Sequence, residues 1–111
     1  MVALAVLAAA LTSLHVTVWP QGTGGPSHAW TLRCEPAHGT LPHPAQACAR
    51  LALLDDPFRP VPAGVACSEV YGGPQVARVT GVVRGRKVWA VFRRRDGCET
   101  ARWGRVSFLL R

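Results

Sequence analysis

Acidic side chains are scarce in this sequence. Six aspartates and glutamates stand against 13 lysines and arginines, and the formal net charge is +7. The one adjacent acidic pair, Asp55-Asp56, lies beside a proline just after a predicted helix, which suits a helix end better than a general acid and base. No nucleophile elbow, phosphate-binding loop or H-E-x-x-H pattern occurs. These absences predict that the protein is not an enzyme.

Metal-binding spacings are missing as well. The sequence contains no C-x-x-C or H-x-x-x-H pattern, and its histidines are scattered at His15, His28, His38 and His43. A structural zinc site needs cysteine and histidine ligands at short, regular spacings. We therefore expect no metal ion and no other cofactor.

Also absent is an apolar run that crosses a membrane. Residues 1–14 carry no charge and no turn residue, but they fall short of the roughly 20 apolar residues that a membrane-spanning helix needs. Their length, and the small residues Ala8-Ala9-Ala10, are typical of the core of a secretory signal. We expect residues 1–12 to be a signal-peptide remnant with the start codon upstream, and residues 13–111 to form one secreted domain. The alternative is a buried N-terminal strand or helix.

Four cysteines are present, an even number for a short chain with an export signal. This pattern predicts two disulfides, although the count allows three pairings of Cys34, Cys48, Cys67 and Cys98. A domain of about 100 residues buries a limited share of its surface, so we expect these cross-links to contribute to stability. Free thiols are the alternative if the chain is not exported.

Alternating hydrophobic residues predict an antiparallel sheet. The expected strands cover residues 14–19, 28–34, 75–83, 87–94 and 105–110. The first two pair as a hairpin, and the next two are joined by the tight turn Arg84-Gly85-Arg86. One helix is expected at Pro44–Leu54, where proline stands at the start and apolar residues recur at helical spacing, and Cys98 is expected in a loop. The predicted fold class is α+β: a five-stranded antiparallel sheet packed with one or two helices.

Basic residues gather in the C-terminal third of the chain. They are Arg84, Arg86, Lys87, Arg93, Arg94, Arg95, Arg102 and Arg105. A basic patch can bind nucleic acid, but no nucleic-acid motif accompanies these residues and they lie in strand-like stretches. We interpret them as a solvated sheet face and expect no nucleic-acid partner; a basic nucleic-acid or cell-surface binder is the distant alternative.

The most distinctive segment is Val65–Pro74, V-A-C-S-E-V-Y-G-G-P. It is short and irregular, with a cysteine inside it, prolines before it and Gly-Gly-Pro at its end. Composition alone favours an ordinary loop held by a structural disulfide.

Five motifs, in order, resemble the Streptomyces subtilisin inhibitor family, and the resemblance covers about residues 13–110. They are the first strand Leu14–Val18, the T-L-x-C-x-P run Thr31–Pro36, the stretch Gly39–Leu51 (one residue shorter than the family pattern), the hairpin Gly81–Val88 and the C-E pair Cys98-Glu99. The resemblance implies a secreted serine-protease inhibitor that forms a homodimer through its sheet. It also implies the disulfides Cys34–Cys48 and Cys67–Cys98.

The resemblance further implies where the protease would bind. It places the scissile bond two residues after the third cysteine, between Glu69 and Val70, with Cys67, Ser68 and Tyr71 as flanking residues. Glu69 would then enter the primary specificity pocket of the protease.

Two departures from the family pattern bear on this role. Members often carry a hydrophobic or basic residue where this chain has Glu69, and a carboxylate in an apolar pocket costs desolvation unless a cation meets it. The partner is therefore expected to be a glutamate-preferring serine protease or a subtilisin-like enzyme that leaves the carboxylate partly solvated. Ser68 and Gly72-Gly73-Pro74 also differ from the family pattern and are expected to soften the loop. The alternative function is a non-catalytic binding protein whose inhibition is weak or lost.

Overall fold

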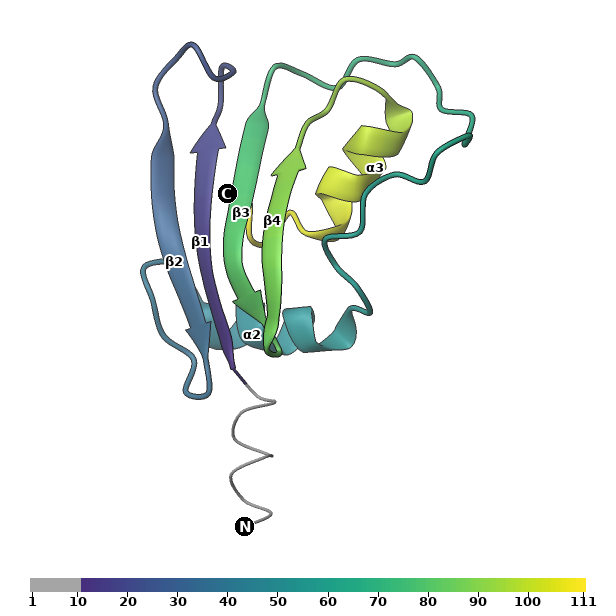
Figure 1. Ribbon diagram of the computed structural model, residues 1–111. Coiled ribbons are helices and arrows are strands. Elements are labelled where there is room, and N and C mark those ends of the chain that lie inside the picture. The colour runs from purple at the N-terminus through teal and green to yellow at the C-terminus, as the bar shows by residue number, and fades with distance from the viewer. Residues whose placement is uncertain (1–10) are drawn as a thin grey trace.

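A four-stranded antiparallel sheet forms one layer of the protein (Figure 1). The structure, a computed structural model, describes residues 11–111. The strands are β1 (Thr12–Trp19), β2 (His28–Cys34), β3 (Val76–Val83) and β4 (Arg86–Phe92), in the order β2-β1-β3-β4 across the sheet. The first strand therefore lies inside the sheet, with a neighbour on each side.

Strand β1 joins the two halves of the sheet because it pairs along its length with both β2 and β3. Its alternating residues Leu14, Val16 and Val18 lie in the core and are at most 3% exposed. At Gly81 in β3 the two strands come so close that an added Cβ would collide with the Ser13 carbonyl oxygen, and φ there is 134°. Glycine is therefore required at this point of the strand.

Both predicted hairpins are confirmed. Strands β1 and β2 pair antiparallel, with Thr12 opposite Cys34 and Val18 opposite His28. Strands β3 and β4 are joined by the two residues Arg84-Gly85, whose φ values are 49° and 82°. Two consecutive positive φ values give a two-residue turn the twist that matches its flanking strands.

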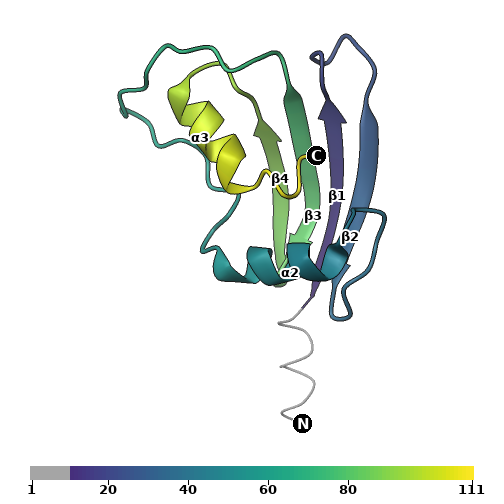
Figure 2. The same ribbon diagram turned by 180° about the vertical axis from the view of Figure 1, so that it is seen from behind.

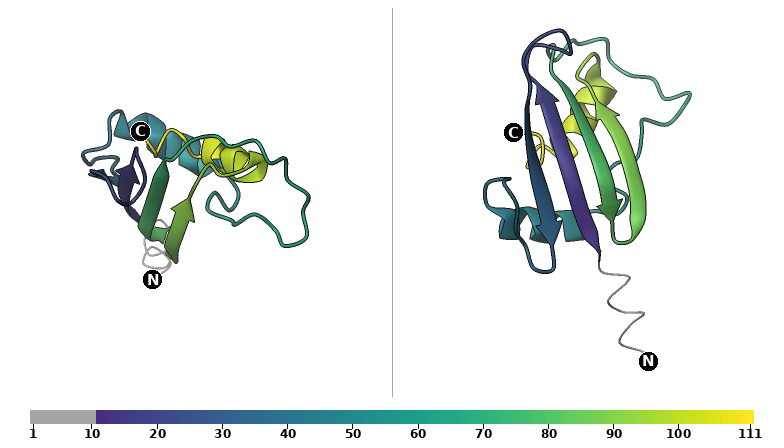
Figure 3. Two further views of the ribbon diagram at one scale, coloured as in Figure 1. Left: turned by 90° about the horizontal axis from the view of Figure 1, so that it is seen from above. Right: turned by 60° about the vertical axis from the view of Figure 1, so that its left-hand side comes forward.

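Two helices cover one face of the sheet, as the views from behind and from above show (Figures 2 and 3). Helix α2 (Pro44–Leu53) confirms the predicted helix, although it ends one residue earlier, and it buries Ala47 and Leu51. Helix α3 (Gly97–Arg105) buries Trp103. The core lies between this helical layer and the sheet, so the architecture is α+β as predicted.

Helix α3 corrects the expectation that Cys98 lies in a loop, because Cys98 is in the first turn of this helix. The Asp96 side chain caps the helix by accepting a hydrogen bond from the Glu99 N–H at 2.9 Å. An acid at the cap followed by a glutamate three residues later is typical of a helix start. The sequence carries this signal at Asp96–Glu99.

The sheet has four strands and not the predicted five. Residues 105–110 form the end of α3 and the turns that follow it, where the Leu109 N–H donates to the Val106 carbonyl at 2.8 Å. Val106 and Leu109 are fully buried, and Phe108 and Leu110 nearly so. These side chains fill the core beside the helices, which an exposed edge strand with two alternating faces would not achieve.

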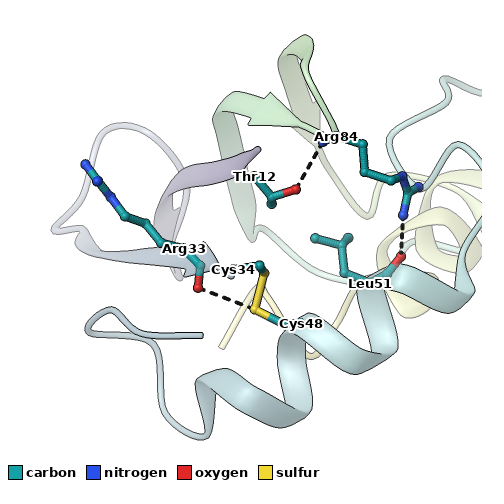
Figure 4. The surroundings of a disulfide bond; sticks show 6 residues. All are labelled: Thr12, Arg33, Cys34, Cys48, Leu51 and Arg84. Carbon is teal, nitrogen blue, oxygen red and sulfur yellow. Dashed lines mark hydrogen bonds between the residues drawn. A yellow bond between two sulfur atoms is a disulfide. The ribbon is translucent and has the colours of Figure 1, made fainter. Parts of the chain in front are cut away.

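Helix α2 is fixed to one end of the sheet by a disulfide and an arginine (Figure 4). The disulfide joins Cys34, the last residue of β2, to Cys48. The Arg84 guanidinium donates to the Leu51 and Leu54 carbonyls at 3.4 and 3.0 Å. A cation is favourable at these carbonyls, because they belong to the negative end of the helix dipole.

The predicted signal-peptide remnant, residues 1–12, lies outside the described residues except for its last two. Thr12 is already the first residue of β1, one position before the predicted start of the domain. Within residues 11–111, no helix has the length and apolar character needed to span a bilayer.

Burial of the C-terminal residues predicts the effect of two matched substitutions. Leu109→Ala should lower the free energy of unfolding by about 2–5 kcal/mol, since Leu109 is fully buried. Leu53→Ala should change it by less than about 0.5 kcal/mol, since Leu53 is 85% exposed. Urea unfolding measures both; equal effects would contradict this packing.

Candidate functional site

A long irregular segment connects α2 to β3 and extends outward beyond α3 (Figures 1 and 3). Residues 54–75 contain no helix and no strand. Prolines at 57, 60 and 62 remove backbone donors and fix φ, so this segment cannot join the sheet as a regular strand. The predicted irregular stretch is confirmed, and it includes the segment Val65–Pro74.

A disulfide attaches this segment to helix α3. Cys67 is bonded to Cys98 with their Cα atoms 5.4 Å apart, and the sequence separation is 31 residues. Both pairings implied by the family resemblance are therefore present. A cross-link that closes a loop of this length contributes about 3.5–4 kcal/mol in the chain-entropy view.

Two main-chain hydrogen bonds attach the same segment to the turn before α3. On one side the Gly97 N–H donates to the Ser68 carbonyl at 2.9 Å, and on the other the Gly72 N–H donates to the Arg94 carbonyl at 2.7 Å. Three residues, Glu69 to Tyr71, lie between these two bonds. They lie beside residues 94–97, and the two hydrogen bonds hold the backbone on either side of them.

The residues between the two anchors are exposed. Val70 is 69% and Tyr71 64% exposed, and Glu69 is exposed as well. Within residues 11–111 the Glu69 carboxylate takes part in no ion pair. The segment thus combines a backbone that is hydrogen-bonded at both ends with side chains that are exposed to solvent.

Gly72, one of the residues expected to soften the loop, packs closely against its neighbours. A Cβ added at Gly72 would lie 2.5 Å from the Thr100 hydroxyl oxygen and 3.1 Å from the Arg94 carbonyl oxygen. Only glycine lets the loop backbone approach α3 so closely. The close approach accompanies the Gly72–Arg94 hydrogen bond on the side that follows Val70.

The family model described as subtilisin inhibitor-like matches residues 9–94. The chain belongs to the subtilisin inhibitor-like family. Among the solved structures that it resembles is Streptomyces caespitosus sermetstatin in complex with Bacillus licheniformis subtilisin. The likeness has a TM-score of 0.54 and 27% sequence identity, and it covers 82% of this chain and 89% of that chain. No curated protein matches the sequence.

The family membership agrees with the sequence interpretation of this chain as an inhibitor and not an enzyme. The matched residues include Cys67 and the segment Glu69–Tyr71 and end before Cys98. In this subtilisin inhibitor-like domain, the Cys67–Cys98 disulfide and the Gly97–Ser68 hydrogen bond attach the matched region to helix α3.

The one group of possible metal ligands in the described part of the chain does not suit a metal ion. It consists of Cys67, Asp96 and Cys98. Both sulfur atoms are joined in the disulfide, so neither can act as a thiolate ligand. The Asp96 carboxylate already caps helix α3.

The structure corrects the interpretation of the C-terminal basic residues as one solvated sheet face. Only Arg86 and Lys87 belong to a strand, β4. Arg93–Arg95 lie between β4 and α3, directly beside the exposed segment, while Arg102 and Arg105 lie on α3. Sequence alternation alone could not separate these positions, because it does not reveal that β4 ends at Phe92 and that α3 begins at Gly97.

The packing at Gly72 generates a test of the anchor. Gly72→Ala should lower the free energy of unfolding by about 1–3 kcal/mol, because the added methyl group overpacks the contact with Thr100 and Arg94. Gly24→Ala is the matched control: nothing lies within 4 Å of its Cβ position, and it should be neutral or stabilise by up to about 1 kcal/mol. Chemical denaturation distinguishes the two, and a neutral Gly72→Ala would show that the loop does not contact α3 this closely.

Proposed function

We propose that this protein is a secreted inhibitor of serine endopeptidases that presents the Glu69–Val70 peptide bond as a substrate. The family membership and the likeness to sermetstatin, solved in complex with subtilisin, support the inhibitor role. The observation that carries the proposal is the exposed segment between two anchors on residues 94–98. The two disulfides agree with export, because such bonds persist in oxidising compartments.

Preorganisation supplies the affinity. A flexible substrate loses roughly 1–2 kcal/mol of backbone entropy for each residue that binding fixes. Residues 67–72 are already held when the protein folds, so most of this loss does not recur on binding. The exposed backbone of Glu69–Tyr71 is free to pair with an extended segment of the enzyme, as in β-strand addition.

The same anchors oppose hydrolysis. The protease serine attacks the Glu69 carbonyl carbon, the bond to the Val70 nitrogen breaks, and Glu69 becomes the acyl group of an ester. The new Val70 amine stays beside the ester, because the Gly72 N–H is hydrogen-bonded to the Arg94 carbonyl. On the acyl side, the Ser68 carbonyl is hydrogen-bonded to the Gly97 N–H. It can attack the ester, reform the peptide bond and release the serine before water arrives.

The side chain at the presented bond selects the enzyme. An exposed carboxylate at Glu69 pairs best with a cationic specificity pocket, because burial of an unpaired charge is costly. We propose a glutamate-preferring serine protease as the better partner and a subtilisin-like enzyme as the weaker one. A protein on the same scaffold that only binds, without inhibition, is the alternative.

The homodimer is a further proposal that rests on the family resemblance. The helices occupy one face of the sheet. Trp89 of β4 is 72% exposed and alternates with the buried Ala90 and Phe92, which places it on the opposite face. A second copy would cover this face. Light scattering of the purified protein measures the mass: a dimer supports the proposal and a monomer at high micromolar concentration contradicts it.

Exchange of the presented side chain should change the target. Glu69→Lys should weaken inhibition of a glutamate-preferring protease at least about 100-fold and create inhibition of a trypsin-like enzyme, because the pocket charge must be opposite. Glu35→Lys makes the same charge change at an exposed loop position and should leave the inhibition of both proteases as it is in the wild type. Inhibition constants against subtilisin, a trypsin-like and a glutamate-specific protease measure this. Equal inhibition by wild type and Glu69→Lys would remove Glu69 from the specificity role.

Removal of each disulfide should separate stability from inhibition. The double variants Cys67→Ser/Cys98→Ser and Cys34→Ser/Cys48→Ser should each lose about 3–4 kcal/mol of stability. Only the first should become a rapidly cleaved substrate, because Cys67–Cys98 is the one of the two disulfides that attaches the presented segment. Mass spectrometry of each variant with protease, at a temperature where both are folded, gives the cleavage rates. Similar rates would indicate that the effect is one of stability alone.

A further inference from the structure

The side chain of Arg102 joins three parts of the protein at one point. Its Nε donates to the Arg59 carbonyl at 2.8 Å and its Nη2 to the Phe58 carbonyl at 3.0 Å, both at the start of the irregular segment. Its Nη1 donates to the Val91 carbonyl in β4 at 2.7 Å. Arg102 itself belongs to α3, so one guanidinium connects the helix, the edge strand and the segment.

Aromatic packing fixes this guanidinium in place. Its central carbon lies 4.0 Å from the ring centroid of Phe92, which is fully buried. Phe58 packs edge-on against the same ring, with centroids 6.2 Å apart. A planar guanidinium over an aromatic ring gains cation–π attraction, and its fixed fork aims the donors at separate carbonyls.

The electrostatic environment of Arg102 is that of a structural group. Burial lowers the pKa of its guanidinium from the ordinary value, while Glu99 opposes the shift and Arg105 adds to it. An arginine still stays protonated in proteins. Three main-chain carbonyls accept hydrogen bonds from this guanidinium, which makes it unlike a freely solvated arginine.

The position of Arg102 on α3 relates it to the presented bond. Cys98 and Arg102 are four residues apart, which places them on the same side of the helix. Cys98 holds the segment at Cys67, and Arg102 holds it at Phe58–Arg59. Between these two attachments, the segment and α3 border a cavity of about 260 Å³, which Val61, Val65 and Ala101 help to line. A chain segment attached at both ends can move less than one attached only by the disulfide.

We propose that Arg102 is a positioning residue for inhibition: it fixes the start of the irregular segment so that Glu69–Val70 stays in place when a protease attacks it. This inference rests on the proposed function. Arg102 belongs to the basic cluster that we interpret from the sequence as solvated. Its contacts at Phe58–Arg59 lie about ten residues before the presented bond, so it acts on that bond through the intervening backbone.

The variants Arg102→Gln and Arg102→Lys test the proposal. Glutamine has only two N–H donors, and lysine carries all three of its donors on one nitrogen, whereas Arg102 reaches its three carbonyls from three separate nitrogens. Both variants should therefore raise amide exchange in residues 60–71 and the rate of cleavage at Glu69–Val70 about tenfold or more. Arg105→Gln changes an exposed arginine on the same helix and should leave both quantities unchanged. Val106→Ala, which removes a fully buried side chain near the end of α3, provides a variant of lower stability with Arg102 intact.

The two readouts separate the possible failures. If the wild-type protein inhibits and Arg102→Gln is cleaved no faster than Val106→Ala at equal stability, Arg102 is structural and the proposal is wrong. If the wild type inhibits no protease, the proposed function fails instead, and the exchange rates still show whether Arg102 holds the segment. Unchanged exchange in residues 60–71 of Arg102→Gln would contradict the positioning role in either case.

Discussion

The attachment of one irregular segment to the start of helix α3 is the interaction on which the functional geometry depends. The Cys67–Cys98 disulfide and the hydrogen bonds at Ser68 and Gly72 all end on residues 94–98. These contacts restrain the backbone on both sides of Glu69–Val70, while the side chains stay in solvent. The sheet and the core hold this junction in position, because they fix the end of β4 and the start of α3. The Glu69–Val70 bond, which we propose as the bond presented to a protease, is held on both sides by that one junction.

Local sequence signals were sufficient for most of the fold. Alternation at β1 to β4, the Arg84-Gly85 turn and the proline at the start of α2 each predict their element from nearby residues alone. The prediction of a fifth strand is wrong because residues 105–110 form a short, mostly apolar run, a pattern that a buried turn satisfies as well as a strand does. The Asp96–Glu99 cap signalled α3, but its nine residues include two glycines and weak helix formers, so propensity did not predict it.

The candidate site was predicted in part. The disulfide pairing and the place of Glu69–Val70 came from the family resemblance, and the structure bears out the pairing. The anchors were not predicted, because the Gly72–Arg94 and Gly97–Ser68 bonds join main-chain atoms, and a glycine in the sequence does not indicate which carbonyl its backbone approaches. Arg102 looks like any exposed arginine in the sequence. Only the folded arrangement shows that its three partners are carbonyls from two separate segments.

Resynthesis of the presented bond is the most direct measurement of the central claim. Protein cleaved only between Glu69 and Val70 is purified and incubated with a catalytic amount of an inhibited protease, and mass spectrometry follows the intact chain. The account predicts that the intact chain reappears and that the same ratio of intact to cleaved protein is reached from either starting material. Cleaved protein that never religates, or that is degraded at other bonds, would contradict a segment whose new ends are held together.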